Sequence, residues 1–356
     1  MSNDFDTKIQ QHWRRPSLGL SCVLWPLSLL FASVSGLRRL AYRRGWKKQA
    51  RLPVPVVVVG NIHVGGVGKT PIVMALVQAF QARGLRVGVI SRGYGRRSSA
   101  TQCVVAGGSA ADYGDEPLLI AQSTGVPVAV GSSRYAAGQC LLAAHPDLDL
   151  IVTDDGLQHY ALARDFEVVV LSAGYGLANT GLLPQGPLRE PLSRLAQADA
   201  LVITQAEQLA RIQAQLPPSP PRFLSTLTPG VFYRLDDPKQ TATAAQLQGL
   251  PLTAVAGIGQ PQKFYQTLAG LGLSLSATLS FPDHHVYQAS DFIDANAVFV
   301  VTEKDAVKLK NIPLLQVWVL PVSATIEPNL AAFVCAELGL KAHRPPAPMS
   351  HHPYSE

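Results

Sequence analysis

The sequence predicts an α/β fold, in which a mostly parallel sheet carries helices on both faces and a second, smaller α/β domain follows. Short apolar runs that suit buried strands alternate with segments of helical spacing. The 356 residues are more than twice the roughly 150 of a typical domain. Apolar residues make up 47% of the chain and charged residues 15%, a composition that excludes a disordered chain.

An apolar segment stands before the predicted sheet. Residues 17–36 read SLGLSCVLWPLSLLFASVSG, without a charge, and about 20 such residues in a helix cross a hydrocarbon core about 30 Å thick. Pro26 is tolerated because membrane helices accept proline. Three interpretations are open: a cleaved signal peptide, a core helix of a soluble domain, and a membrane anchor that spans the bilayer or lies in its interface. No convincing small-residue cleavage site follows, so we favour the membrane-associated helix.

Basic residues follow the apolar segment and predict its orientation. Because positive flanks stay in the cytoplasm, we expect the large C-terminal part of the chain there. The net charge of +6 and the pI of about 9.2 suit an anionic membrane surface or a phosphorylated substrate. Four scattered cysteines show neither metal-ligand nor disulfide spacing, which fits a reduced compartment. The basic residues are Arg38, Arg39, Arg43, Arg44, Lys47, Lys48 and Arg51.

The remaining chain divides into blocks. Apolar runs predict strands in VPVVVVG, RVGVIS, VPVAVG, LDLIVTDD, FEVVVLS and ADALVIT, and helical spacing predicts a helix over 70–83. A proline-rich stretch at 215–222 breaks the pattern. A second α/β block begins near Leu252 with LTAVAGIGQPQKF, AVFVVTEKDAVKL and QVWVLPV. We therefore expect an anchor with its basic flank (1–52), a first domain (53–230), a linker (231–250), a second domain (251–340) and a disordered tail (341–356).

A glycine-rich turn between the first strand and the helix predicts a phosphate-binding loop. The stretch VVVVGNIHVGGVGKTP matches the usual pattern at Gly68, Lys69 and Thr70, although His63 stands at the first glycine position. Gly65 and Gly66 still let backbone N–H groups turn toward anionic oxygens. Lys69 is expected to reach the β- and γ-phosphates of ATP, and the Thr70 hydroxyl to ligate Mg²⁺. The first domain is thus P-loop NTPase-like.

Carboxylates for a magnesium ion follow another apolar strand. LDLIVTDDGLQH ends in Asp154 and Asp155, as expected of a Walker B strand. Adjacent strand residues point to opposite faces, so one aspartate can face the metal while the other holds a loop. Gln158 and His159 come directly afterwards and are candidates to meet the same phosphates.

Three further polar motifs interrupt apolar or loop stretches. YGDEP contains Asp115 and Glu116, and LLPQGPLREP contains Arg189 and Glu190. SFPDHHVY contains Asp283, His284 and His285. A phosphoryl acceptor hydroxyl needs a base near neutral pH, and a histidine or a histidine–carboxylate pair can supply one.

Taken in order, these motifs resemble one family. VVVVGNIHVGGVGKTP, SRGYGR, GDEP, DDGLQH, GPLREP, FPDHH and TEKDAVKL, with the apolar N-terminus, are similar to tetraacyldisaccharide 4′-kinase, the lipid A 4′-kinase of Gram-negative bacteria. The resemblance covers residues 15–335 and includes the missing first glycine. It implies transfer of the ATP γ-phosphoryl group to the 4′-hydroxyl of a tetraacylated disaccharide 1-phosphate, giving lipid IV-A. It also implies two α/β/α domains joined by a short β-linker, at the cytoplasmic face of the inner membrane.

The resemblance also implies roles for single residues. Asp115 resembles the family's catalytic base and His284, preferred over His285, the histidine that tunes it. Phosphate binding falls to the glycine loop with Gln158 and His159, and Mg²⁺ binding to Thr70, Asp154 or Asp155, with Glu190 nearby. Anionic substrate oxygens suit guanidinium groups. The substrate-binding candidates are Arg92, Glu116, Arg134 and Arg189.

Two other functions compete with the kinase. A membrane-positioning or partitioning switch ATPase shares GGVGKT, but such proteins place a lysine before the two glycines, where this chain has Val64. A chaperone for metal or cofactor delivery predicts a cysteine or histidine cluster near the loop, and only His63 stands there. We expect no nucleic-acid partner, because the basic residues concentrate beside the apolar segment.

Overall fold

The computed structural model describes residues 9, 11–13, 16–105, 107–174, 177, 179–292, 297–310, 312 and 316–341. The predicted tail lies outside these residues, apart from residue 341. The chain forms two compact units, each assembled from separate stretches of sequence. The first unit contains the described residues up to Lys69, Leu150–Thr226 and Ile326–Leu340, and the second contains Thr70–Asp149 and Leu227–Thr325. The domain boundaries expected from sequence position stay a prediction.

A parallel sheet of five strands forms the core of the first unit, in the order β8-β7-β6-β1-β5. Every residue of β1 and β6 is buried, as expected of a parallel sheet packed on both faces. Val57 pairs with Val152 on the β5 side and with Phe166 on the β6 side, so β1 lies inside the sheet. The strands are β1 (Val56–Gly60), β5 (Leu150–Thr153), β6 (Phe166–Ser172), β7 (Ala200–Thr204) and β8 (Arg222–Pro229).

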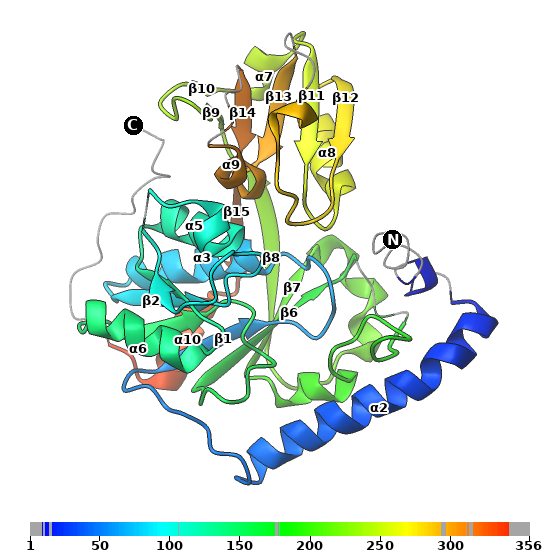
Figure 1. Ribbon diagram of the computed structural model, residues 1–356, viewed down its shortest axis with the longest axis vertical. Helices are drawn as coiled ribbons and strands as arrows, with labels where there is room; N and C mark the ends of the chain where they lie inside the picture. Colours follow the sequence, from blue (N-terminus) through cyan, green and yellow to red (C-terminus); the bar gives the residue numbers. More distant parts are fainter. Residues whose placement is uncertain are drawn as a thin grey trace. The chain divides into compact units, whose positions relative to one another are not determined.

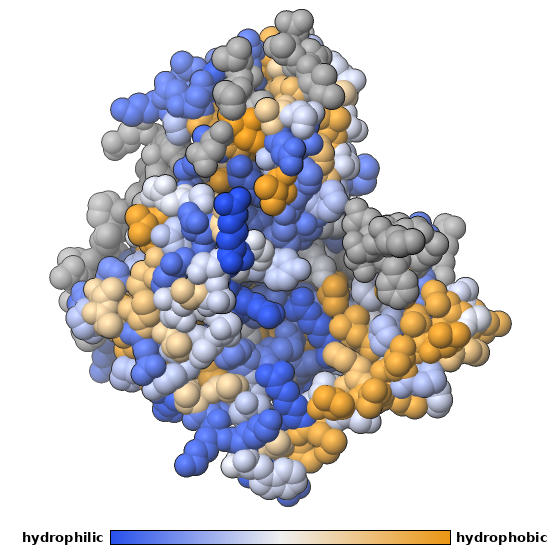
Figure 2. Space-filling model, viewed as in Figure 1, coloured by the Kyte–Doolittle hydropathy of each residue, from blue (hydrophilic) through white to orange (hydrophobic). Residues whose placement is uncertain are grey.

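The long helix of the first unit is α2 (Leu18–Arg43), drawn in blue in Figure 1. Among the described residues it alone is long and apolar enough to cross a membrane. Only Leu24 and Ser28 of this helix are buried, and its exposed apolar side chains form an orange surface in Figure 2. A core helix of a soluble domain would be mostly buried, so this exposure disagrees with that alternative. The helix expected over 17–36 is confirmed, and it continues through the first basic residues.

Shorter helices complete the first unit. Its described residues include the 3₁₀ helices η1 (Leu192–Gln197), η2 (Ala206–Arg211) and η3 (Gln213–Gln215), and the helix α10 (Leu330–Leu338). Three elements cross from one unit into the other along the chain: α3 (Lys69–Gln81), β8 (Arg222–Pro229) and β15 (Val322–Glu327).

The second unit contains a three-stranded group and a six-stranded sheet. In the first group β4 pairs in parallel with β2 and antiparallel with β3. The sheet has the order β10-β9-β14-β13-β11-β12, with β9 and β10 antiparallel at one edge. The strands are β2 (Val87–Ser91), β3 (Gln102–Cys103), β4 (Val128–Val130), β9 (Phe232–Arg234), β10 (Thr241–Ala242), β11 (Leu252–Ala256), β12 (Leu275–Ser280), β13 (Val298–Thr302) and β14 (Val317–Leu320).

Alternating residues of the six-stranded sheet belong to two separate cores. Ala254 and Val300 pack with residues of α8, whereas Val255 and Val301 pack with residues of α9. This period of two follows from the pleat of a strand. Residues 231–250, expected as a linker, contribute β9, β10 and α7 to this unit. The helices are α4 (Ala110–Tyr113), α5 (Asp115–Thr124), α6 (Arg134–Ala144), α7 (Ala244–Leu247), α8 (Pro261–Gly270), η4 (Ala289–Asp291) and α9 (Glu303–Leu309).

Candidate active site

The glycine-rich loop follows β1 in the first unit and leads into α3. Gly65 and Gly68 have φ angles of 109° and 85°, which L side chains rarely adopt, and this explains glycine at both positions. Gly65 and Gly66 are exposed, whereas His63 is buried. Burial lowers the pKa of His63 to about 4. The His63 side chain is therefore neutral near pH 7, and it adds no charge to the loop.

The GPLREP segment is paired with the first half of this loop through the backbone. The Val64 N–H donates to the Pro187 carbonyl at 2.8 Å, and the Arg189 N–H donates to the Ile62 carbonyl at 2.7 Å. Arg189 is thereby fixed beside the loop, and its Nη1 lies 3.2 Å from an Asp155 carboxylate oxygen.

Lys69 and Asp155 form the charged centre of this region. Lys69 Nζ lies 3.4 Å from Asp155 Oδ1 and donates to Asn61 Oδ1 at 3.3 Å. Burial would raise the pKa of Asp155, but the positive charges of Lys69 and Arg189 outweigh it and lower that pKa below its ordinary value. Asp155 is thus an anion between two cations, in the turn that follows β5.

The other predicted metal ligands lie in different surroundings. Asp154 is buried, with 1% of its surface exposed, and Thr70 is buried in the first turn of α3. The described residues contain no group of three or more histidine, cysteine or acidic side chains placed to hold a metal ion. Mg²⁺ usually takes one or two carboxylates, with substrate phosphates and water as its other ligands. A hydroxyl and an aspartate therefore suffice chemically, and their role as ligands stays a prediction.

Glu190 lies in a network of its own rather than with the aspartates. Its carboxylate accepts hydrogen bonds from Gln158 Nε2 at 2.9 Å and from Tyr160 Oη at 2.5 Å. Arg39 Nη1 and Arg194 Nε each lie 3.4 Å from Glu190 Oε2. Gln158 also donates to the Asn61 carbonyl at 3.0 Å, which links the network to the loop.

Tyr160 belongs to the same network, and its burial beside Glu190 raises the pKa of the phenol to about 12. His159 lies in the same turn. Its carbonyl accepts a hydrogen bond from Arg164 Nη2 at 2.7 Å, and its side chain is half-buried.

A second polar cluster lies within the second unit and centres on Asp115. Asp115 begins α5 and is 4% exposed. His284 Nδ1 lies 2.9 Å and 3.0 Å from its two carboxylate oxygens, although 169 residues separate them. His285 instead contacts Asp291 at 2.9 Å. The structure thus pairs Asp115 with His284, the histidine that the resemblance favours, while the catalytic roles of both residues stay a prediction.

Opposite charges shift both members of the Asp115–His284 pair toward their ionised forms. Burial would raise the pKa of Asp115, but the hydrogen bond with His284 and the charge of Lys304 outweigh it and lower that pKa. Burial would lower the pKa of His284, but the hydrogen bond with Asp115 prevails and raises it. Asp115 is therefore deprotonated, as a proton acceptor must be, and the imidazole fixes the orientation of its carboxylate.

The SRGYG loop packs against this pair. Gly114, with a φ angle of 91°, lies so close to Gly93 that an added Cβ would stand 3.0 Å from the Gly93 Cα. The Tyr94 ring lies 4.9 Å from the His284 ring, centroid to centroid. The glycines of SRGYG and YGDEP therefore permit close backbone approach, and this brings an aromatic ring to the histidine.

The remaining substrate candidates differ in exposure. Arg92 is exposed, and Glu116 is half-buried next to Asp115. Arg134 is 4% exposed at the start of α6, where its Nη1 donates to the Gly131 carbonyl at 3.1 Å. Substrate binding by these residues and by Arg189 stays a prediction.

Sequence reasoning gave no role to Lys304, although its motif TEKDAVKL belongs to the ordered set. Its ammonium lies 3.0 Å from Glu116 Oε1 and 3.8 Å from Asp115 Oδ2. Its position could have indicated a role, because Lys304 comes just after the buried strand β13, as Asp154 and Asp155 come just after β5.

Comparisons with known proteins agree with this geometry. The family model described as tetraacyldisaccharide-1-P 4′-kinase matches residues 20–339. A tetraacyldisaccharide 4′-kinase of Chromobacterium violaceum is 52% identical over 342 residues, which cover 94% of this chain and 99% of the relative. A tetraacyldisaccharide 4′-kinase of Neisseria meningitidis serogroup C is 50% identical over 338 residues, which cover 94% and 96%.

A solved structure agrees with these sequence relatives. The crystal structure of LpxK from Aquifex aeolicus in complex with ATP superposes with a TM-score of 0.76 at 31% identity, covering 89% of this chain and 99% of that one. The predicted α/β fold is confirmed. The chain, with its glycine-rich loop and its Asp115–His284 pair, belongs to the tetraacyldisaccharide-1-P 4′-kinase family.

Proposed function

We propose that this chain, an ATP-dependent kinase by its family, transfers the γ-phosphoryl group of ATP to the 4′-hydroxyl of a tetraacylated disaccharide 1-phosphate. The Asp115–His284 contact carries this proposal, because a switch ATPase has no acceptor hydroxyl to deprotonate. As the hydroxyl oxygen bonds to the γ-phosphorus, Asp115 takes its proton. The bond from that phosphorus to the bridging oxygen breaks, and ADP leaves.

The nucleotide is held by the loop after β1. Backbone N–H groups of Gly65, Gly66 and Gly68 point at the phosphates, and the N-terminus of α3 adds its positive end. In the structure the Lys69 ammonium is paired with the Asp155 carboxylate. When ATP binds, the ammonium leaves Asp155 and pairs with phosphate oxygens instead. Gln158 donates to the Asn61 carbonyl of the loop. Gln158 and His159, the next residue, contact the same phosphates. Arg189 supplies a second positive charge.

The residues of the loop and of the turn after β5 fit Mg²⁺. Thr70 and one of Asp154 and Asp155 would hold the ion, and Mg²⁺ neutralises charge on the transferred phosphoryl group when bound. Glu190 supports this region through Gln158 rather than as a ligand, because two arginines and Tyr160 already surround its carboxylate.

The acceptor lipid brings the enzyme to a membrane. A substrate with four acyl chains stays in the bilayer, so we infer that α2 binds the cytoplasmic face of the inner membrane. Its exposed apolar side chains include Leu18, Val23 and Leu30, and basic residues follow them in sequence. Apolar burial and attraction to anionic headgroups add together in such a segment.

Transfer is tested with ATP radiolabelled in its γ-phosphate and the tetraacyl disaccharide 1-phosphate in detergent micelles. Label is expected in the lipid. Asp115→Asn should lower kcat by at least about 100-fold, because it removes the proton acceptor, while ATP affinity changes little. Label released only as free phosphate would contradict the transfer reaction. Equal loss of transfer and ATP binding in Asp115→Asn would contradict the role of Asp115 as base.

The alternative function as a membrane-positioning switch ATPase is not favoured. The relatives from Chromobacterium violaceum and Neisseria meningitidis are both named as kinases, over nearly the whole chain. No observation on the described residues favours a metal-delivery chaperone.

A further inference from the structure

One ammonium group, that of Lys304, faces three carboxylates of the second unit. Its Nζ lies 3.0 Å from Glu116 Oε1, 3.0 Å from Asp283 Oδ1 and 3.8 Å from Asp115 Oδ2. The side chain is 16% exposed. These carboxylates come from two separate places: the first turn of α5 and the segment that carries His284. Lys304 therefore joins both halves of the Asp115–His284 pair.

The helix that carries Lys304 is itself held firmly. Thr302 caps α9, with its Oγ1 accepting from the Asp305 N–H at 3.1 Å. The Asp305 carboxylate is fully buried, and it accepts from Tyr287 Oη at 2.9 Å and pairs with Lys308 at 2.8 Å. A helix fixed at its first turn gives Lys304 a defined position.

The segment that carries His284 needs such a hold. His284 has a φ angle of 63°, a conformation that is strained for a non-glycine residue and persists only when the surroundings enforce it. Asp283 Oδ1 accepts both the His284 N–H at 3.1 Å and the Lys304 ammonium at 3.0 Å. A single carboxylate oxygen of Asp283 thus connects the Lys304 ammonium to the backbone of His284.

We propose that Lys304 is a positioning residue of the phosphoryl transfer, which fixes His284 against Asp115 and keeps the Asp115 carboxylate charged. The proposal rests on the proposed function, in which Asp115 accepts the acceptor proton. The proposed role of Lys304 requires no contact with the nucleotide or the acceptor. It acts through Asp283 on the histidine and through its charge on the carboxylate.

The charges around the pair determine the direction of the pH effect. The charges of His284, Lys304 and Lys308 lower the pKa of Asp115, and the charge of Asp283 raises the pKa of His284. Lys304 keeps its charge at any working pH, because Glu116 and Asp115 outweigh its burial and raise its pKa. The charge of Lys304 lowers the pKa of both Asp115 and His284. Its removal therefore raises the pKa of either member, so the sign does not depend on which one titrates.

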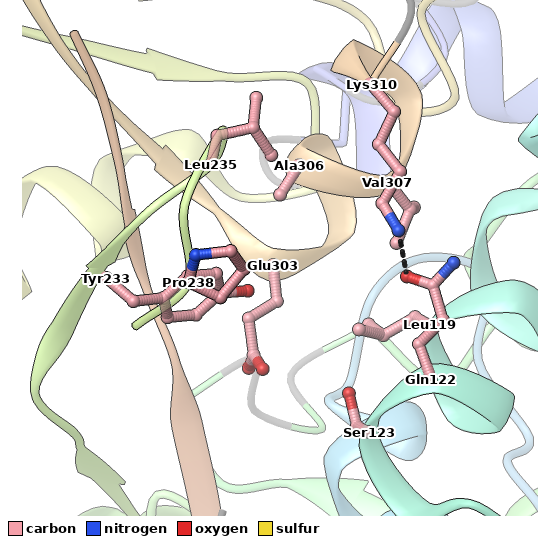
Figure 3. A pocket seen from close by; sticks show the side chains of 10 residues that line it. All are labelled: Leu119, Gln122, Ser123, Tyr233, Leu235, Pro238, Glu303, Ala306, Val307 and Lys310. Atoms are coloured by element: carbon pink, nitrogen blue, oxygen red, sulfur yellow. Dashed lines mark hydrogen bonds between the residues drawn. The ribbon is translucent and has the colours of Figure 1, made fainter. Parts of the chain in front are cut away.

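A matched control exists on the same pair of helices. Lys310, just after α9, donates to Gln122 Oε1 of α5 at 3.1 Å. Figure 3 shows this contact across a pocket between α5 and α9, in which Lys310 points at Gln122. Lys310 thus links the same two helices without reaching Asp115, Glu116 or Asp283. A purely structural link would make the two lysines equivalent.

The experiment compares Lys304→Met, Lys304→Arg and Lys310→Met in the full-length chain, using the micelle transfer reaction. For each variant we measure kcat against pH, the affinity for ATP, and the thermal unfolding midpoint. Asp283→Asn is a fourth variant, which neutralises the carboxylate that pairs with Lys304 and so weakens the link to the histidine segment, while leaving Lys304 in place. The Asp283 side chain is 34% exposed, so this variant should fold normally. It therefore tests the positioning role even if Lys304→Met folds poorly.

Lys304→Met is expected to lower kcat by roughly tenfold to 100-fold, the range that misplacement of a reacting group produces. ATP affinity should stay within about twofold, and the acidic limb of the kcat profile should move up by about one pH unit, as expected when an opposite charge within about 4–6 Å is lost. Lys304→Arg should restore part of kcat and the position of the limb. Asp283→Asn should lower kcat, and Lys310→Met should resemble the unmodified protein.

The inference is overturned if Lys304→Met keeps both the kcat and the acidic limb of the Lys310→Met control, or if Asp283→Asn has full kcat. An Asp115→Asn variant measured in the same series distinguishes failure of the positioning role of Lys304 from failure of the role of Asp115 as base. Loss of transfer in Asp115→Asn together with a normal Lys304→Met contradicts the positioning role alone. Retained transfer in Asp115→Asn contradicts the proposed base instead.

Discussion

Asp155 and His284 share an unusual backbone conformation. Both are non-glycine residues with positive φ, at 49° and 63°, and such strain tends to collect at functional sites. In each case charged neighbours compensate. Asp155 is held by Lys69 and Arg189, and His284 by Asp115. The energy of these contacts fixes side chains in a geometry that a relaxed loop would not maintain.

The ion pair of His284 predicts a pH dependence of stability. Its folded-state pKa is raised above the ordinary 6.5, so protonated His284 stabilises the fold below that pH, and this contribution is lost as pH rises through the folded pKa. His284→Gln should therefore lower the free energy of unfolding more at about pH 5.5 than at about pH 9. Urea melts at both pH values measure the difference.

The control for this prediction is the same substitution in an Asp115→Asn background. Asparagine keeps a hydrogen-bond acceptor but lacks the negative charge that favours protonated His284, so the effect of His284→Gln should lose most of its pH dependence. An effect that is larger at the higher pH, or one unchanged by Asp115→Asn, would contradict the ion pair as its source.

Strands were predictable where burial on both faces left a continuous apolar run. β1, β6, β7, β11 and β13 all coincide with such runs. β12 escaped prediction, because its residues are mostly exposed or half-buried and follow no apolar pattern. β8 begins at Arg222, the last residue of the proline-rich break. The prolines argued against a strand there, but β8 pairs in parallel with β7 through hydrogen bonds.

The helix α2 predicts membrane binding that depends on its exposed apolar face. Leu30 is 62% exposed, and Leu30→Glu should reduce binding to anionic vesicles by more than about tenfold, since a buried leucine contributes about 1.5–3 kcal/mol. Flotation of the full-length protein with vesicles of anionic phospholipid measures this. Leu250→Glu is the matched control, because Leu250 is 39% exposed after α7. Equal loss in both variants would contradict a specific role of α2.

The two polar clusters differ in how far the sequence could predict them. The glycine-rich loop and the DDGLQH turn follow strands that hydrogen-bond to each other, β1 and β5, so local pattern and sheet topology together place Lys69 beside Asp155. Asp115 and His284 are 169 residues apart, and no spacing rule joins them. Their pairing was expected only through the family resemblance. Lys304 was missed because a lysine in a helical first turn usually signals a solvated surface.

ATP should stabilise the whole protein through the glycine-rich loop and independently of the Asp115 cluster. At a nucleotide concentration of about 100 times Kd, binding to the folded state alone adds about 2.7 kcal/mol to the free energy of unfolding. Lys69→Met should lose most of this gain, because the ammonium that meets the β- and γ-phosphates is gone. Asp115→Asn should keep it, although its transfer activity is lost. Unfolding of each variant with and without Mg²⁺ and ATP measures both effects. If Asp115→Asn loses the ATP gain as fully as Lys69→Met, Asp115 supports nucleotide binding, and its assignment as the base of the transfer step fails.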